Sequence, residues 1–382
     1  HRSGIARGEL VWLGSGFNRE QVLHHLRFLK PESPFRSQWS YQNMMFLAAG
    51  EAAGKAAGTS WDELVKTRIF TPLGMTYSQT SSRGMTATDV AIPHGQRKDS
   101  VYDEPMFDGY NIGPAGAILS NAHDMAQWLR FQLNDAVVNG KRLIAAPAFH
   151  ETHTPQAIST LGGGRPAPGD TAEPATHFHT YGFGWFVEDY HHQLRWQHGG
   201  NTPGMTTAVG MLPEKHFGVV VLSSMASASL PGILMDYIMD RDLNLPMKDL
   251  SAEAHARTLA QRRRADSASV AQAGAPKGQS STPLNAFVGT YVDSLYGELT
   301  ISLDNGSLEL TRSQWKGPLE YVSANNWRWI TPGDAPLPEL PLKFEIAPDN
   351  TVTGVYFGLG ADATLMMKKS ARGGRGGRGG RP

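Results

Sequence analysis

The hydrophobic and polar positions of residues 1 to about 250 follow helical and strand-like patterns in alternation. Several segments place apolar residues at helical spacing between capping residues and glycines. They predict helices over 43–58, 59–70, 121–133 and 229–244. The short apolar run 219–222 is typical of a central strand, and residues 159–180, rich in Gly, Pro and Thr, predict a long loop. This mixture indicates an α/β (α+β) domain.

The pattern changes after residue 250. Residues 266–283 contain few apolar side chains and predict a linker, whereas after Leu284 the sequence alternates with period two. Asp304-Asn305-Gly306 is a strong hairpin signal within that part. We therefore expect four parts: an α/β domain (1–250), a helix end and linker (251–283), an all-β barrel-like domain (284–369) and a disordered tail of Arg-Gly-Gly repeats (370–382).

Composition limits the classes of function. The chain of 382 residues has 35 basic and 35 acidic side chains, so it has no net attraction to nucleic acid or to a membrane surface. It has no cysteine, which excludes disulfides, thiolate zinc sites and cysteine nucleophiles. No apolar run approaches the roughly 20 residues that a membrane span needs. We expect no cofactor and no membrane span.

Tyr41-Gln42-Asn43 stands at the entry to the first predicted helix. A Tyr and an Asn two residues apart can present a phenol and an amide to one cleft. By itself so short a pattern is more typical of a Tyr that caps a core helix.

His198-Gly199-Gly200-Asn201 is the second candidate. Two consecutive glycines allow a substrate or another backbone to approach closely, and the His places an imidazole beside them. Taken alone, the segment is more typical of a Gly-rich turn between strands.

Read together and in order, these segments resemble class C β-lactamase-like serine hydrolases, a superfamily that includes penicillin-binding proteins, D-aminopeptidases and β-lactamase-like carboxylesterases. The resemblance covers residues 1 to about 245, and the C-terminal part resembles the small β-domain often appended to these hydrolases. The segments that carry it are His1-Arg2-Ser3-Gly4-Ile5, Tyr41-Gln42-Asn43, Ile69 to Met75, Gly113 to Leu129, Tyr181-Gly182-Phe183-Gly184-Trp185 and His198-Gly199-Gly200. The resemblance implies an antiparallel sheet flanked by helices, with a helical subdomain.

In this family a Ser-x-x-Lys pair forms an acyl-enzyme with a small ester, amide or peptide. The resemblance implies that Tyr41 is the phenol that relays protons, with Asn43 as its amide partner. His198 begins the strand motif that holds the substrate, together with Gly199 and Gly200. The backbone N–H of Asn201 would stabilise the oxyanion.

The strand motif departs from the family's Lys-Thr-Gly form. His198 stands where a Lys carries a fixed positive charge, and an unperturbed His is largely neutral near pH 7. Gly199 stands where a hydroxyl residue binds a carboxylate. Both departures favour esters and amides over β-lactams.

The larger departure is the nucleophile. The chain's single Ser-x-x-Lys match, Ser313 to Lys316, lies in the all-β part, and we interpret it as accidental. The first residue already resembles mid-domain sequence. We therefore expect that the nucleophile lies outside this chain, and that the chain alone catalyses no acyl transfer.

Other features favour simpler interpretations. His177, His179, His191 and His192 are expected to be surface or loop residues, because no further ligand stands at zinc spacing. Trp315, Trp327 and Trp329 are expected in the β-domain core rather than on a sugar platform. The alternatives to an enzyme are a non-catalytic binding module on the same scaffold and, more remotely, an RNA-associated protein acting through its tail. The resemblance favours a periplasmic or secreted location.

Overall fold

The structure is a computed structural model that describes residues 1–5, 7–85, 88–97, 100–159, 176–256, 258–260, 280–332 and 339–369. The chain divides into two compact units. Unit 1 comprises His1–Ile5 and Pro31–Ala268, and unit 2 comprises Ala6–Lys30 and Ser269–Pro382.

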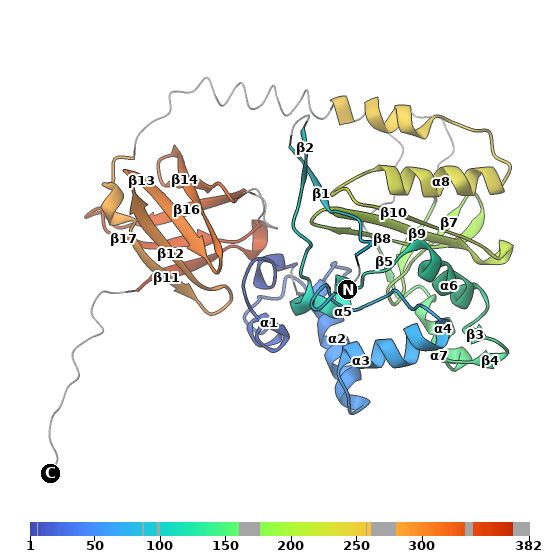
Figure 1. The fold of residues 1–382 in the computed structure, drawn as a ribbon. Helices are drawn as coiled ribbons and strands as arrows, with labels where there is room; N and C mark the ends of the chain where they lie inside the picture. The colour runs from blue at the N-terminus through green and yellow to red at the C-terminus, as the bar shows by residue number, and fades with distance from the viewer. Residues whose placement is uncertain are drawn as a thin grey trace, which may run out of the picture. The chain divides into compact units, whose positions relative to one another are not determined.

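A six-stranded antiparallel sheet forms the centre of unit 1 (Figure 1). Its strands follow one another in chain order, so each pairs with its neighbours in the sequence. They are β5 (Ala157–Ile158), β6 (His179–Tyr181), β7 (Phe186–Tyr190), β8 (Gln193–Thr202), β9 (Met205–Leu212) and β10 (Phe217–Ser223). The apolar run predicted as a strand is β10.

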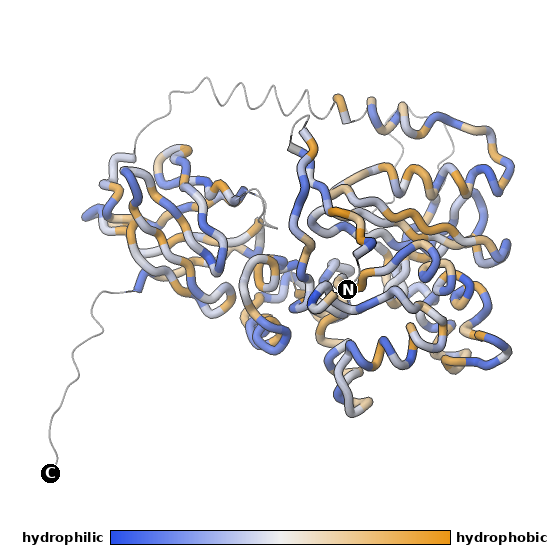
Figure 2. The backbone as a smooth tube through the Cα atoms, in the orientation of Figure 1, coloured by the Kyte–Doolittle hydropathy of each residue, from blue (hydrophilic) through white to orange (hydrophobic). Residues whose placement is uncertain are grey.

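Helices cover both faces of this sheet (Figure 1). Ala208 and Leu212 of β9 pack with Met235 and Met239 of α8 (Leu230–Asp242), whereas Met211 packs with Leu129 of α6 (Ala122–Leu133) on the other face. A Cβ at Gly210 would lie 2.6 Å from Met239 and 2.7 Å from Met235, so this glycine allows α8 to approach the sheet. Figure 2 shows the hydrophobic residues concentrated along these central strands.

The helical part of unit 1 has a core of its own. Trp61, Val65 and Phe70 pack with Phe131 of α6 and with Phe149. The elements of this part are α2 (Asn43–Ala56), α3 (Trp61–Val65), the π-helical turn η2 (Lys66–Phe70), α4 (Thr71–Leu73), η3 (Tyr110–Ile112), α5 (Gly113–Gly116) and α7 (Ala146–Thr152). Three short elements complete unit 1: the hairpin β1 (His94–Arg97) with β2 (Ser100–Asp103), the hairpin β3 (Val137–Val138) with β4 (Lys141–Arg142), and η4 (Pro213–Lys215).

Unit 2 contains a closed eight-stranded barrel (Figure 1). Its strands are β11 (Gly289–Asp293), β12 (Gly297–Asp304), β13 (Ser307–Arg312), β14 (Trp315–Ser323), β15 (Asn326–Trp329), β16 (Leu340–Ile346), β17 (Val352–Phe357) and β18 (Thr364–Lys368), with the short helices η5 (Leu284–Ala286) and η6 (Gly360–Asp362). β11 pairs with β18 and closes the barrel. Large side chains fill the interior, among them the buried Trp327 and Trp329, whereas Trp315 is only partly buried.

Residues 7–30 of unit 2 contain η1 (Glu9–Val11) and α1 (Arg19–Leu26) and contact the barrel residues. Arg312 of β13 donates hydrogen bonds to the carbonyls of Leu10 (2.5 Å) and Leu13 (3.1 Å). The backbone N–H of Gly8 donates to Asp362 (2.7 Å). Burial lowers the pKa of Arg312 to about 10, so the guanidinium stays charged at neutral pH.

Replacing Arg312 by Met is expected to loosen residues 9–26. The two carbonyls lose a charged donor in a buried place, a loss typically worth about 2 kcal/mol. Hydrogen exchange in peptides covering this segment should become about 30-fold faster, as followed by mass spectrometry. Arg328→Met is the matched control, because this barrel arginine is exposed and pairs with Glu320 and Glu339 at the surface. Equal hydrogen-exchange rates of residues 9–26 in the two variants would contradict the assigned role of Arg312.

The structure agrees with the expected fold class: a helix-flanked antiparallel sheet with a helical subdomain, and a C-terminal barrel. The expected helices correspond to α2, α3 with η2, α6 and α8, and the Asp304-Asn305-Gly306 hairpin joins β12 to β13. One difference concerns the division into domains, since residues 6–30 group with the barrel rather than with the remainder of 1–250. The predicted tail, most of the linker and most of the 159–180 loop lie outside the described residues.

Candidate active site

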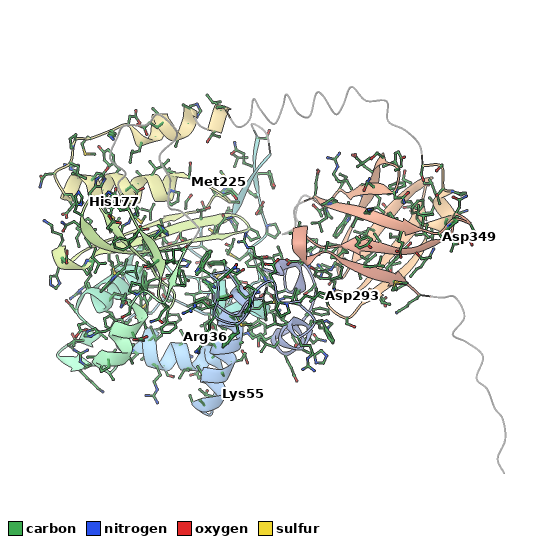
Figure 3. All side chains as sticks on the ribbon, turned by 180° about the vertical axis from the view of Figure 1, so that it is seen from behind. Arg36, Lys55, His177, Met225, Asp293 and Asp349 are labelled. Carbon is green, nitrogen blue, oxygen red and sulfur yellow. The ribbon has the colours of Figure 1, made fainter. Side chains whose placement is uncertain are left out.

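The first residues of the chain are bound to the segment that leads into α2. Arg2 donates to the carbonyl of Arg36 (2.6 Å), a residue labelled in Figure 3, and to the carbonyl of Gln156 (2.9 Å). Gly4 has φ +78°, and a Cβ there would lie 2.2 Å from the carbonyl oxygen of Ser33. Only glycine fits this close approach, which explains the Gly of the His1-Arg2-Ser3-Gly4 segment.

The Tyr41-Gln42-Asn43 segment forms the start of α2. Gln42 is fully buried and is the N-cap, because its side-chain oxygen accepts from the N–H of Met44 (3.0 Å). The N–H of Gln42 donates to Nδ1 of His1 (2.9 Å). Tyr41 is half-buried beside the cap, and Asn43 is the first helical residue. The middle residue of the motif therefore caps the helix.

His198, Gly199 and Gly200 lie in the second half of β8. The pairing with β7 ends at Gln197 opposite Phe186, whereas the pairing with β9 continues to Thr202. β8 is thus an inner strand of the sheet, but no strand of the described residues pairs with one edge of residues 198–202. Gly199 and Gly200 are exposed there. A strand edge of this kind can pair with the backbone of an extended ligand.

Asn201 is exposed on the same stretch, and its side chain is occupied. Its side-chain oxygen accepts from the N–H of Ser227 (2.8 Å) and from the hydroxyl of Thr206 (3.1 Å). These bonds tie the end of β8 to β9 and to the segment after β10. The side chain therefore has a structural task, and only the backbone of Asn201 is available for an oxyanion.

One group of rings, which we call the aromatic cluster, joins the two candidate segments. Its members are His1, Trp39, Tyr41, Phe46, Tyr181, Phe186 and His198. The ring of His1 lies 4.2 Å from that of Tyr41 and 4.6 Å from that of Tyr181. The hydroxyl of Tyr181 lies 3.1 Å from Nε2 of His198. Tyr41 and His198 therefore belong to one contiguous cluster, although they are distant in the sequence.

Burial governs the electrostatics of the aromatic cluster. It lowers the pKa of His198, against the opposing effect of a hydrogen bond to the Gly199 carbonyl. It also raises the pKa of Tyr181, with a smaller contribution from Tyr41. His198 is therefore neutral at pH 7, and Tyr181 keeps its proton.

A buried charged row crosses the same strands. His179, Glu188 and Arg195 are direct cross-strand partners on β6, β7 and β8. Glu188 is fully buried and pairs with both His179 and Arg195, and Arg195 also contacts Asp236 of α8 (2.7 Å). The expectation of a surface or loop position was wrong for His179, because its side chain is only 8% exposed.

Ser313 lies in the turn between β13 and β14, with φ 53°. Lys316 pairs with Glu309 on the neighbouring strand. The chain's Ser-x-x-Lys match therefore lies in a barrel hairpin and not at the start of a helix.

The described ranges contain no group of three or more His, Asp or Glu side chains that could hold a metal ion. Within the same ranges, no helix has the length and apolar character that crossing a membrane requires.

Sequence reasoning did not assign a role to His1 or to Tyr181, although both belong to segments that carried the resemblance. The signal that could have found Tyr181 is strand register. Tyr181 pairs with Phe186, and Phe186 pairs with Gln197, which places Tyr181 two strands from His198.

Comparison with known proteins gives the family. Residues 1–232, more than half of the chain, match the model described as "Beta-lactamase". The chain belongs to the β-lactamase family. Residues 274–372 of this β-lactamase family protein match a second model, described as a domain of unknown function (DUF3471).

Two curated relatives are fungal hydrolases. An unguisins hydrolase of Aspergillus violaceofuscus is 24% identical over 336 residues, which cover 82% of this chain and 59% of that protein. Its counterpart in Aspergillus campestris is 23% identical over 256 residues, which cover 64% of this chain and 45% of that protein. The β-lactamase family chain thus spans about half the length of these relatives.

Among solved structures, the octameric penicillin-binding protein homologue from Pyrococcus abyssi is similar with a TM-score of 0.56. The match covers 96% of this chain and 76% of that one, at 19% identity. At this identity the similarity concerns the fold alone, which is a mixed helix and sheet β-lactamase-like fold with a C-terminal barrel.

Proposed function

We propose that this chain carries the proton-relay and strand elements of a serine hydrolase that cleaves small esters, amides or D-amino peptides through an acyl-enzyme. Tyr41 is the phenol that relays protons, with Asn43 as its amide partner. Residues 198–201 of β8 hold the acyl group. The nucleophilic Ser and its Lys lie on a segment outside these 382 residues.

One observation carries this proposal. Tyr41 and His198 of β8 belong to the same aromatic cluster, in a chain of the β-lactamase family. A proton relay and a substrate-binding strand must flank one reacting carbonyl, and this shared cluster supports such an arrangement. The names of the two Aspergillus relatives support hydrolysis as the class of reaction.

The free edge of β8 supports an oxyanion site. No strand among the described residues pairs with residues 198–202 on one side, which supports a role of backbone N–H groups there in binding a developing negative charge. We assign this role to the N–H of Asn201. The tie between its side chain and Ser227 and Thr206 would keep that N–H in place. One such donor is typically worth about 3 kcal/mol in the transition state.

The substrate class follows from charge. His198 is neutral because burial lowers its pKa, and Gly199 has no hydroxyl. A substrate carboxylate at this position would therefore meet no fixed positive charge. Neutral esters and amides fit this strand better than a β-lactam with its carboxylate.

The experiment compares two proteins. One is the 382-residue chain, and the other is a longer form that begins upstream of His1 and includes a Ser-x-x-Lys helix, which we call the extended form. The extended form should hydrolyse p-nitrophenyl esters, and the chain alone should not, because loss of a nucleophile typically costs about a million-fold in rate. Nitrocefin should be a poor substrate. An extended form that binds esters without turnover would instead indicate a non-catalytic binding module.

A further inference from the structure

Both ring nitrogens of His198 have hydrogen-bond partners. Nδ1 lies 2.6 Å from the carbonyl oxygen of Gly199, and Nε2 lies 3.1 Å from the hydroxyl of Tyr181. A carbonyl oxygen only accepts, so Nδ1 must carry a hydrogen. In a neutral ring Nε2 is then an acceptor, and the Tyr181 hydroxyl donates to it.

We propose that Tyr181 is a positioning residue that holds His198 as a neutral imidazole with its hydrogen on Nδ1, so that the substrate-binding strand presents its backbone and no cation. The protonation state assigned to His198 does not depend on the proposed function. Its consequence for the substrate, a preference for acyl groups without a nearby carboxylate, rests on the proposed function.

The cost of adding a proton to His198 supports this assignment. A protonated ring would point an N–H at the Tyr181 oxygen, and the hydroxyl would have to turn away. The Tyr181 hydroxyl makes no other hydrogen bond to a described residue, and Tyr181 is only 4% exposed. Its hydrogen would be left buried without an acceptor, an arrangement that folded proteins avoid.

The described residues that contact His198 are uncharged. Tyr181 of β6 and Phe186 of β7 contact the ring, and Val209 of β9 is its cross-strand partner. His198 makes no ion pair with any described residue, and the rings of His1 and Tyr181 link it to Tyr41. Burial lowers the pKa of His198 and raises that of Tyr181, so Tyr181 remains the donor.

Nitrogen-15 NMR of the histidine rings of the 382-residue chain tests the proposal. His198 is assigned from the signal that disappears in His198→Gln. We expect the Nδ1–H tautomer and a titration midpoint below the ordinary value of 6.5. Tyr181→Phe should raise that midpoint by about one pH unit, because the neutral ring loses its donor. Tyr190→Phe is the control, since Tyr190 is equally buried and its hydroxyl bonds Asp240 instead.

In the wild-type chain, a titration midpoint of His198 at or above 6.5, or a hydrogen on its Nε2, would overturn the proposal. This measurement needs no variant, so it applies even if Tyr181→Phe fails to fold. An unchanged midpoint in a folded Tyr181→Phe variant would overturn it as well. These readouts require no turnover. Absence of ester hydrolysis by the extended form would therefore defeat the proposed function separately.

Discussion

Replacing Tyr41 by Phe in the extended form is expected to lower kcat/KM for p-nitrophenyl esters about 1,000-fold, because proton transfer by a positioned side chain contributes roughly 10²–10⁴. The ring and its packing against His1 remain, so the substitution removes only the phenol hydroxyl. If Tyr41 acts in the transition state, kcat should fall as much as kcat/KM, with KM nearly unchanged.

Tyr77→Phe is the matched control, because Tyr77 is 74% exposed and lies outside the aromatic cluster. Its rate should match that of the unmodified enzyme. Turnover by Tyr41→Phe within about twofold of the control would remove Tyr41 from the proton relay and would leave the fold assignment intact.

A Glu188→Gln substitution is expected to destabilise unit 1 by about 3 kcal/mol, since removing one partner of a buried ion pair leaves the other charge uncompensated. Glu188 is fully buried between His179 and Arg195, and among the residues that the structure describes only Asp236 would remain to balance Arg195. Calorimetry of the full chain should show one transition lowered by about 6–10 °C. Glu63→Gln, at an exposed i,i+3 pair with Lys66, should shift no transition measurably.

The effect of Glu188→Gln should depend on pH. Burial opposes ionisation of Glu188, but the hydrogen bond from His179 and the charge of Arg195 outweigh it, so the pKa is lowered from 4.5. A carboxyl with a lowered folded-state pKa stabilises the fold above its unfolded value, and that contribution is lost as the pH falls through the folded value. The difference in the free energy of unfolding between wild type and variant should therefore be largest near pH 7 and should shrink below pH 4.5. A difference that grows in acid would contradict this role.

Local sequence signals were sufficient where the chain's own neighbours determine the structure. The helix α2 and the hairpin at Asn305-Gly306 follow from short segments read one at a time, whereas the Gln42 cap of this helix was not predicted. The candidate residues Tyr41 and His198 could also be predicted from the sequence, because each belongs to a short motif and these motifs follow the same order as in the family.

Features that depend on strand register or on distant partners were not predictable from such segments. Glu188 interrupts an apolar strand, and only its cross-strand neighbours His179 and Arg195 explain its burial. Residues 6–30 carry no pattern that links them to the barrel, because the bonds from Arg312 end on backbone carbonyls. Every residue has a backbone carbonyl, so the sequence does not show which carbonyls accept a hydrogen bond. The association of residues 6–30 with the barrel is therefore visible only in the structure.

The central claim is that these 382 residues provide the relay and the strand of an acyl-enzyme site and that the nucleophile lies elsewhere. Labelling with a fluorophosphonate, followed by mass spectrometry of the peptides, tests it most directly. We predict a single modified Ser in the extended form, within its Ser-x-x-Lys helix, and no modified residue in the 382-residue chain. Stoichiometric labelling of a Ser within residues 1–382, Ser313 above all, would contradict the account.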